Sequence, residues 1–140
     1  WTVMILIACV DDRCGIAFNH RRQSSDSVVR NRILELTAGS RLWMNEYSAK
    51  QFDLDTTPQI NISAEFLNEA VPGDYCLVED VSVSTYEKWV EQIILFKWNR
   101  VYPQDRAFDI DLTQNKWKLQ SKEDFSGHSH ENVTMEVYVR

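Results

Sequence analysis

The sequence has few of the residues that mark special structural classes. Its 140 residues include only four glycines, three prolines and three cysteines. With so little glycine, no glycine-rich phosphate-binding loop is found. An odd number of cysteines without CxxC spacing argues against a disulfide framework or a cysteine-ligated zinc site. The longest apolar run, at 3–10, is far shorter than the roughly 20 residues that a membrane-spanning helix needs.

Positive charge is also scarce. Fifteen Lys and Arg against twenty-one Asp and Glu give a formal net charge of −6. Nucleic acids and acidic membranes bind net basic faces, so the composition argues against both as partners. The apolar run at 3–10 lacks a basic leader and a small-residue cleavage site, so we expect a reduced, cytoplasmic protein. A hydrophobic content of 44% with five Trp predicts one well-filled domain over residues 1–140.

Hydrophobic patterning predicts strands that alternate with helices. A helix is expected to begin near Asp26 and to end at Gly39, with Val29, Ile33 and Leu36 on its buried face. Strands are expected at 3–10, 41–44, 59–62, 74–79, 93–101, 117–119 and 133–139, further helices at 45–52, 63–70 and 84–92, and a polar loop at 11–25. This order predicts an α/β protein with a mixed, mainly parallel central sheet and helices on both faces.

Several short motifs occur in an order known from one enzyme family. They are 8–19 (ACVDDRCGIAFN), 32–39 (RILELTAG), 42–44 (LWM), 108–112 (FDIDL), 117–119 (WKL) and 135–140 (MEVYVR). In this order they resemble the strands, loop and helix end of the dihydrofolate reductase family. The resemblance covers most of residues 3–140 and is strongest at both ends. It implies the dihydrofolate reductase-like fold for the whole chain.

The positions that match the family's active site carry different residues. Position by position, the family's L-P-W motif falls on Arg22, Gln23 and Ser24, and the carboxylate that anchors and helps to protonate the pterin falls on Val29. Valine cannot hold or transfer a proton. The nearby Asp26 lies about 300° around the expected helix and should not point where Val29 points. The resemblance therefore implies a divergent member without reductase activity.

The positions that match the family's cofactor motifs are altered as well. The M-G-R-x-T motif falls on 44–48 (MNEYS), and the V-I-G-G turn falls on 79–80 or, in a second register, on 81–82. Neither register supplies the glycines that let backbone approach a pyrophosphate. The stretch 52–59 is also too short for the strand and loops that hold the adenosine half in the family. The resemblance implies a shortened adenosine-binding region and no NADPH or other cofactor.

A basic loop offers a candidate ligand site. His20, Arg21 and Arg22, with Ser24 beside them, could receive an anionic ligand or an acidic partner. An ordinary solvated loop explains the same charges, because clusters of charge are common on protein surfaces.

A second candidate surface follows the strand expected at 93–101. On a strand, Trp98, Arg100 and Tyr102 would share one face, and these residue types dominate interface hot spots. Packing of Trp98 under a helix, with Arg100 paired to an acid, explains them equally well.

The pair His128 and His130 suggests a metal, because alternate residues on a strand lie on one side. Two histidines and one following acid are too few ligands, so we expect a polar turn and no metal. An enzyme of another class, such as a metal-dependent, nuclease-like hydrolase that uses His128 and His130, stays open as an alternative.

The sequence thus favours a pseudoenzyme that works as a binding or regulatory module. A small ligand, an unknown protein partner or a second copy of the chain in a homodimer are the partners that the residues leave open. Residual binding of folate or a nucleotide without turnover is a second alternative to this interpretation.

Overall fold

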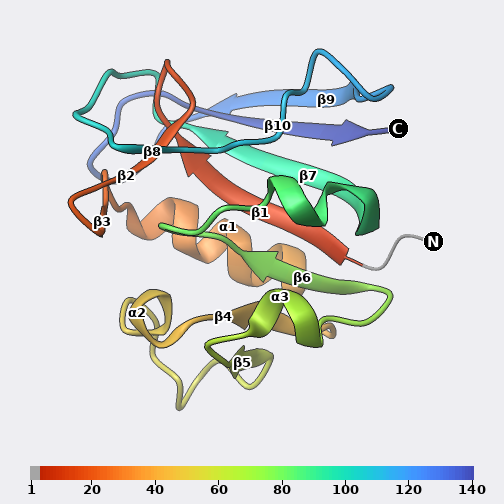
Figure 1. The fold of residues 1–140 in the computed structure, drawn as a ribbon. Helices are drawn as coiled ribbons and strands as arrows, with labels where there is room; N and C mark the ends of the chain where they lie inside the picture. Colours follow the sequence, from red (N-terminus) through yellow and green to blue (C-terminus); the bar gives the residue numbers. More distant parts are fainter. Residues whose placement is uncertain (1–3) are drawn as a thin grey trace.

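The computed structural model of the protein describes residues 4–140 and is built around a seven-stranded sheet (Figure 1). Along the sheet the strands are β5 (Ile60–Ile62), β4 (Leu42–Met44), β6 (Asp74–Leu77), β1 (Met4–Val10), β7 (Val90–Lys97), β10 (Val133–Val139) and β9 (Lys118–Phe125). A small sheet holds β3 (Arg21–Arg22), β2 (Gly15–Phe18) and β8 (Arg106–Ala107). The helices are α1 (Ser27–Thr37), α2 (Glu46–Ala49), α3 (Phe66–Glu69) and a 3-10 helix, η1 (Ser84–Trp89). Residues 1–3, which include the expected start of the first strand, lie outside the described residues.

The central sheet is mixed and mainly parallel, as predicted. Strand β1 pairs in parallel with β6 and β7, and β4 pairs in parallel with β5 and β6. Only β10 runs antiparallel to its neighbours β7 and β9. The apolar run of β1 lies at the centre because a strand covered on both faces has no polar side to present.

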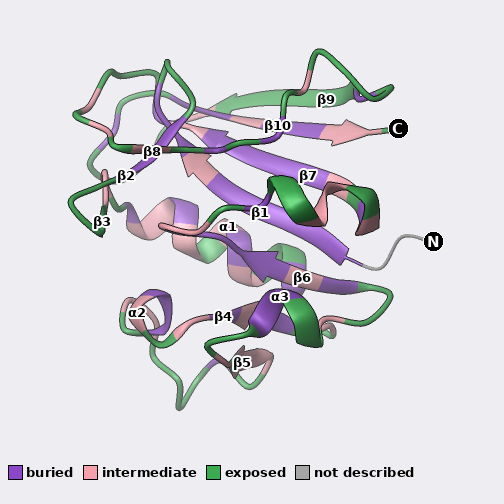
Figure 2. Cartoon of the chain, in the orientation of Figure 1, coloured by how far each residue is buried: buried purple, intermediate pink, exposed green. Residues whose placement is uncertain are grey.

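Both faces of the sheet are covered (Figure 2). On one face Ile5 and Ile7 of β1 pack in the same cluster as Val29 and Ile33 of α1, with α2 beside them. On the other face the alternate β1 residues share a cluster with α3, η1 and the small sheet. The two faces follow from the two-residue period of a strand, and they confirm the expected helices on both sides.

Helix α1 begins at the predicted cap. The side chain of Asp26 accepts hydrogen bonds from the backbone N–H groups of Val28 and Val29, and Gly39, with φ of 81°, follows the last turn. The prediction of the buried face of α1 was partly wrong, since Leu36 is 36% exposed and Thr37 is fully buried instead. The Thr37 hydroxyl donates to the Ile33 carbonyl at 2.8 Å, so its burial leaves no polar group unsatisfied.

The predicted helix at 84–92 is a shorter 3-10 helix, and β7 begins at Val90. Residues 84–87 (STYE) have the pattern of a capping box, but no side-chain cap hydrogen bond forms at the start of the helix. Asp109 from a distant loop accepts hydrogen bonds from the backbone N–H of Val83 at 2.8 Å and of Ser84 at 3.1 Å, while the Glu87 carboxylate accepts one from Trp117 Nε1 at 2.9 Å. Tertiary contacts thus replace the local cap that the sequence pattern indicates.

Three other boundaries differ from the prediction. The loop at 11–25 contains β2 and β3, whose paired residues are too few for a periodic pattern. Strand β7 ends at Lys97 and leaves 98–101 outside the sheet. The strand expected at 117–119 is the start of the eight-residue β9, whose exposed polar side chains show no hydrophobic alternation. Among residues 4–140, no helix is long and apolar enough to cross a membrane.

Candidate functional site

The space between β1 and α1 is closed by side chains. Cys9, Val29, Ile33, Leu77 and Trp98 are among the residues around a residual space of only about 10 Å³. Such a space holds at most one water molecule. Val29, on the buried face of α1, contributes an aliphatic wall and no acid to this closed cleft.

An ion pair lies at the edge of the closed cleft. The guanidinium Nε of Arg22 lies 3.2 and 3.1 Å from the two carboxylate oxygens of Glu79, and its Cζ lies 4.3 Å from the centre of the Tyr47 ring. Glu79 also accepts hydrogen bonds from the Ser48 hydroxyl at 2.8 Å and from Gln51 Nε2 at 3.2 Å. Arg22 is therefore neutralised within the chain and does not face outward as an anion receptor.

The other cations of the basic loop differ in their partners. His20 Nδ1 lies 2.9 Å from the carboxylate of Asp80, which also pairs with Arg106 at 3.1 Å. Arg21 is exposed and makes no ion pair within residues 4–140. His20 and Arg22 thus contact two consecutive acids, Asp80 and Glu79, and the anion site expected at this loop stays a prediction that rests on Arg21.

Asp26 connects α1 to the turn between β9 and β10. Its Oδ1 accepts backbone hydrogen bonds from Val28 at 2.9 Å and His128 at 3.0 Å. Its Oδ2 accepts from the Ser129 N–H at 2.9 Å and from His130 Nδ1 at 2.9 Å. Burial alone would raise the pKa of Asp26, but these hydrogen bonds outweigh it and hold the pKa well below its usual range. The buried carboxylate is ionised at neutral pH.

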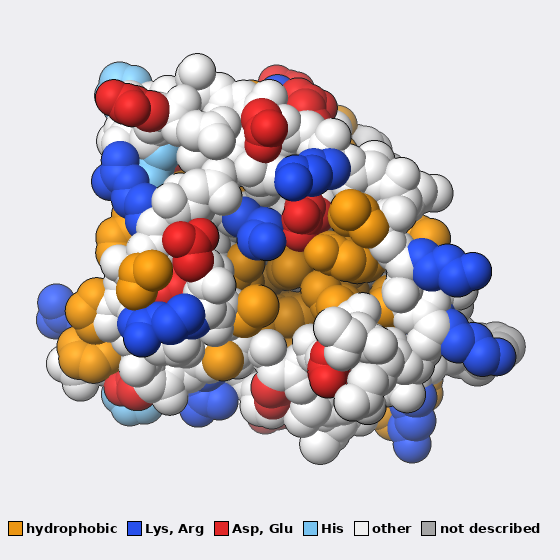
Figure 3. Space-filling model, turned by 90° about the horizontal axis from the view of Figure 1, so that it is seen from above, with side chains coloured by type: hydrophobic (Ala, Val, Ile, Leu, Met, Phe, Trp, Pro, Cys, Tyr) orange, Lys and Arg blue, Asp and Glu red, His pale blue; other side chains and the backbone are white. Residues whose placement is uncertain are grey.

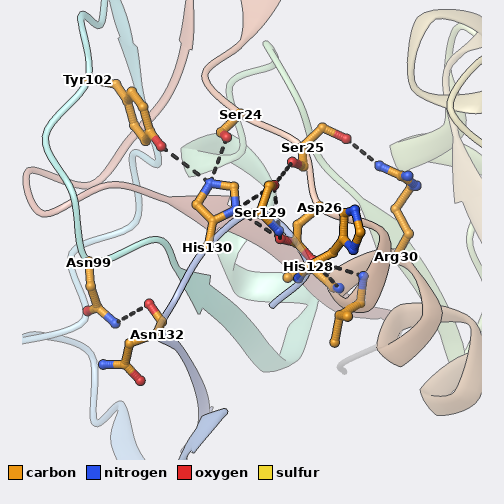
Figure 4. Close-up of polar contacts among 12 residues, drawn as sticks. Ser24, Ser25, Asp26, Arg30, Asn99, Tyr102, His128, Ser129, His130 and Asn132 are labelled. Atoms are coloured by element: carbon orange, nitrogen blue, oxygen red, sulfur yellow. Dashed lines mark hydrogen bonds and ion pairs between the residues drawn. The ribbon is translucent and has the colours of Figure 1, made fainter. Parts of the chain in front are cut away.

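The imidazole of His130 links Asp26 to two hydroxyl groups (Figure 4). It is 4% exposed and stacks on the Trp98 ring with a centroid distance of 4.4 Å. Because the ionised carboxylate of Asp26 only accepts, Nδ1 carries a proton, and in the neutral imidazole the lone pair of Nε2 faces the hydroxyl groups of Ser24 at 2.8 Å and Tyr102 at 3.3 Å. The result is a serine–histidine–aspartate chain of hydrogen bonds.

The geometry expected for a metal site at His128 and His130 is wrong. Both residues lie in the turn between β9 and β10, not on a strand, and His128 is exposed while His130 is buried. Both nitrogens of His130 already have hydrogen-bond partners. Within the described residues 4–140, no three His, Cys, Asp or Glu side chains are grouped to hold a metal ion.

The three candidate interface residues do not share a strand face. Trp98 is 2% exposed and packs on His130, so it is not available to a partner. Arg100 is exposed, and Tyr102 is half-buried with its hydroxyl on His130. They diverge because β7 ends at Lys97, and an interface role for Arg100 and Tyr102 stays a prediction.

Among the surface hollows of residues 4–140, one lies beside the small sheet and another beside β7 and β10. The first has a volume of about 350 Å³ and is lined by Phe18, Asn19, Arg21, Arg22, Gln23, Tyr102 and Pro103. The second, of about 450 Å³, lies between the 108–113 segment and the strands β7 and β10. Seen from the side of β9 and β10, the molecule is hollowed over a hydrophobic floor with acidic and basic side chains around it (Figure 3). The first hollow is lined both by Arg21, which makes no ion pair among the described residues, and by Tyr102, whose hydroxyl contacts His130.

Sequence reasoning missed the Ser24–His130–Asp26 arrangement. His130 lies 104 positions from Asp26 and 106 from Ser24, so no local spacing could indicate that they meet. Gly127 is the one signal in the sequence for the close approach of this turn. A Cβ at that position would lie 2.6 Å from Asp26 Oδ2, so only glycine allows the turn to approach the carboxylate.

The fold was compared with known proteins. Neither the models of known protein families nor the curated protein sequences contain a match to this chain. Among solved structures, a dihydrofolate reductase from Enterococcus faecalis, complexed with NADP(H) and RAB-propyl, is similar to it with a TM-score of 0.70 and 12% sequence identity. The similarity covers 99% of this chain and 96% of that one.

The fold is that of dihydrofolate reductase. At 12% identity the similarity establishes architecture and no activity. Within this dihydrofolate reductase fold, the turn after β6 carries Glu79 and Asp80, and Asp80 has a φ of 53°, a left-handed conformation that favours glycine.

Proposed function

We propose that this protein is a ligand-binding module of the dihydrofolate reductase fold that has no NADPH-dependent reductase activity. The closed cleft between β1 and α1 carries the proposal. A space of about 10 Å³ cannot admit a pterin ring, and the aliphatic Val29 in its wall cannot supply a proton.

The charges after β6 also support the absence of a dinucleotide. Glu79 and Asp80 place two carboxylates where the resemblance puts the pyrophosphate-binding turn. A carboxylate and a phosphate 4 Å apart repel each other by about 4 kcal/mol near a protein surface. Arg22 pairs with Glu79 and Arg106 pairs with Asp80, so these two cations leave little positive charge for a phosphate.

The ligand in this proposal binds the hollow beside β2. Exposed Phe18 and Pro103 give the hollow apolar walls, and Arg21 supplies a cation without an internal partner among the described residues. A small molecule with an apolar body and a carboxylate has the matching chemistry. Its volume of about 350 Å³ is in the range of small-molecule sites.

Titration calorimetry with NADPH and with a folate analogue tests the proposal. We expect no binding at micromolar concentrations of either ligand and no loss of NADPH absorbance with dihydrofolate. Micromolar binding of either ligand without turnover would favour residual folate or nucleotide binding instead. Turnover of dihydrofolate would refute the proposal outright.

We also propose a protein partner or a homodimer, and a cytoplasmic location. A homodimer or a protein partner would use the exposed Arg100, and sedimentation of the wild-type chain and of Arg100→Ala at several concentrations tests the dimer. A cytoplasmic, reducing environment suits the three free cysteines, Cys9, Cys14 and Cys76.

A further inference from the structure

We infer that Ser24 is a nucleophile toward carboxylic esters, with His130 as its general base and Asp26 as the residue that positions His130. The inference goes beyond the proposed ligand-binding role. It rests on that role in one respect only, the preference for esters that carry a negative charge in the hollow.

The geometry is that of an activated serine. The Ser24 hydroxyl oxygen lies 2.8 Å from His130 Nε2, and His130 Nδ1 lies 2.9 Å from Asp26 Oδ2 (Figure 4). A nucleophile, a base within hydrogen-bond reach and a third group that orients the base are the requirements for covalent catalysis. Two segments of the chain supply these groups, namely the stretch from Ser24 to the α1 cap Asp26 and the turn before β10.

The base is held in the tautomer that the chemistry needs. The ionised Asp26 carboxylate accepts from Nδ1, which leaves the Nε2 lone pair for the Ser24 proton. The stacked Trp98 ring at 4.4 Å and the 4% exposure of His130 restrict rotation of the imidazole. The same carboxylate stabilises the imidazolium that forms when Nε2 takes a proton.

The nucleophile is accessible although its base is buried. Ser24 is only partly buried: it borders the small closed space between β1 and α1, and the preceding Gln23 lines the hollow beside β2. Tyr102, another residue of this hollow, places its hydroxyl 3.3 Å from the same Nε2. We place the ester in this hollow, from which it would reach Ser24 past Gln23 and Tyr102, and Arg21 favours an acyl group with a free carboxylate.

The reaction balances without a cofactor. Ser24 Oγ forms a bond to the ester carbonyl carbon while its proton moves to His130 Nε2. The tetrahedral intermediate collapses, the carbon–oxygen bond to the alcohol breaks, and His130 returns the proton to the departing alcohol. Water then attacks the acyl-serine by the same route and releases the carboxylic acid, which restores the Ser24 hydroxyl.

Labelling with a fluorophosphonate, located by mass spectrometry, tests the nucleophile. We expect one label per chain on Ser24, none on Ser24→Ala and an unchanged rate in Ser25→Ala, since exposed Ser25 contacts Arg30 and not His130. His130→Gln should slow the labelling by about 100-fold or more because it removes the base. Absence of label on Ser24, or an equal rate in His130→Gln, overturns the inference.

A second pair of variants avoids disturbing the buried histidine. In Ser24→Cys the imidazole can accept the thiol proton, whereas in Ser25→Cys it cannot. We expect iodoacetamide to alkylate Cys at 24 at least about ten times faster than Cys at 25 at neutral pH. Equal rates would show that His130 does not activate this position, and the inference would fail.

The positioning role of Asp26 has its own spectroscopic test. Nitrogen NMR of His130 should show the proton on Nδ1 in the wild type, and Asp26→Asn should move the proton to Nε2 and slow the labelling of Ser24. An unchanged tautomer in Asp26→Asn contradicts the positioning role, whatever the variant does to stability.

The ester preference separates this inference from the proposed function. Wild-type protein should be acylated by the 4-nitrophenyl monoester of succinate about tenfold faster than by 4-nitrophenyl acetate, and Arg21→Gln should remove the difference. Equal acylation by both esters overturns the substrate class. Micromolar NADPH binding by a protein that still labels on Ser24 refutes the proposed function and leaves the nucleophile supported.

Discussion

Replacing Asp26 by asparagine removes one charge from the most heavily hydrogen-bonded side chain of the site. In the wild type, Oδ1 accepts from Val28 and His128, and Oδ2 accepts from Ser129 and His130. An asparagine amide can accept on one side only, and its NH2 group faces N–H donors on the other. Either orientation therefore loses two hydrogen bonds to a charged acceptor.

The expected loss of stability follows from these contacts. A hydrogen bond to a charged group contributes about 1.5–3 kcal/mol, so two of them give about 3 kcal/mol or more. Breaking a buried charged pair costs about 3–5 kcal/mol, which agrees with the estimate from the two hydrogen bonds. Urea unfolding at pH 7 measures the difference between the wild type and Asp26→Asn. Asp12→Asn is the matched control, because Asp12 is exposed and its replacement should change the free energy of unfolding by less than about 0.5 kcal/mol.

The contribution of Asp26 to the stability of the protein decreases as the pH falls. The folded-state pKa of Asp26 lies below its unfolded value of about 3.9. Its contribution is therefore fully present above the unfolded value and is lost as the pH falls through the folded one. The gap between the wild type and Asp26→Asn should stay constant from pH 7 to pH 5 and shrink below about pH 4. A gap under about 1 kcal/mol at pH 7, or one that widens on acidification, would refute the reasoning.

Three further predictions concern the surroundings of the site. Gly127→Ala should destabilise the protein by about 1–3 kcal/mol in urea unfolding, because its Cβ would lie 2.6 Å from Asp26 Oδ2, and no loss would mean that the turn does not pack on the carboxylate. Glu79→Gln should lower the melting temperature, since it breaks the paired contacts to Arg22 at 3.1–3.2 Å, and an unchanged value would mean that the pair contributes nothing. Dialysis against EDTA should leave the melting temperature unchanged, as both nitrogens of His130 are bound within the chain, and a clear drop would point to a metal.

The elements that sequence reasoning predicts well are those whose determinants are local. The apolar run of β1, the Asp26 cap and the Gly39 stop each act within a few residues, and each is found at or near its predicted place. The order of the motifs led to the right fold although identity to the similar reductase is only 12%. Motif order depends on the sequence of strands along the chain, which changes more slowly than side chains do.

The predictions that failed depended on contacts between distant segments. The capping-box pattern at Ser84 is not realised, because Asp109 accepts from the Ser84 N–H, and the partners of Arg22 and His20 in the basic loop, Glu79 and Asp80, lie far away in the sequence. The Ser24–His130–Asp26 chain depends on the same kind of contact. Nothing in the residues near Ser24 indicates which histidine will lie beside it, because the turn that carries His130 is placed by the pairing of β9 with β10.

The connection of Asp26 to the turn before β10 has a consequence for biosynthesis. His130, which hydrogen-bonds to the α1 cap Asp26, lies 104 positions after it in the sequence. The central strand β1 likewise pairs with β7, which is also distant from it in the sequence. A nascent chain on the ribosome therefore holds the acid without its distant donors until nearly the whole domain has emerged. This corner of the molecule can acquire its final structure only after the turn between β9 and β10 has been synthesised.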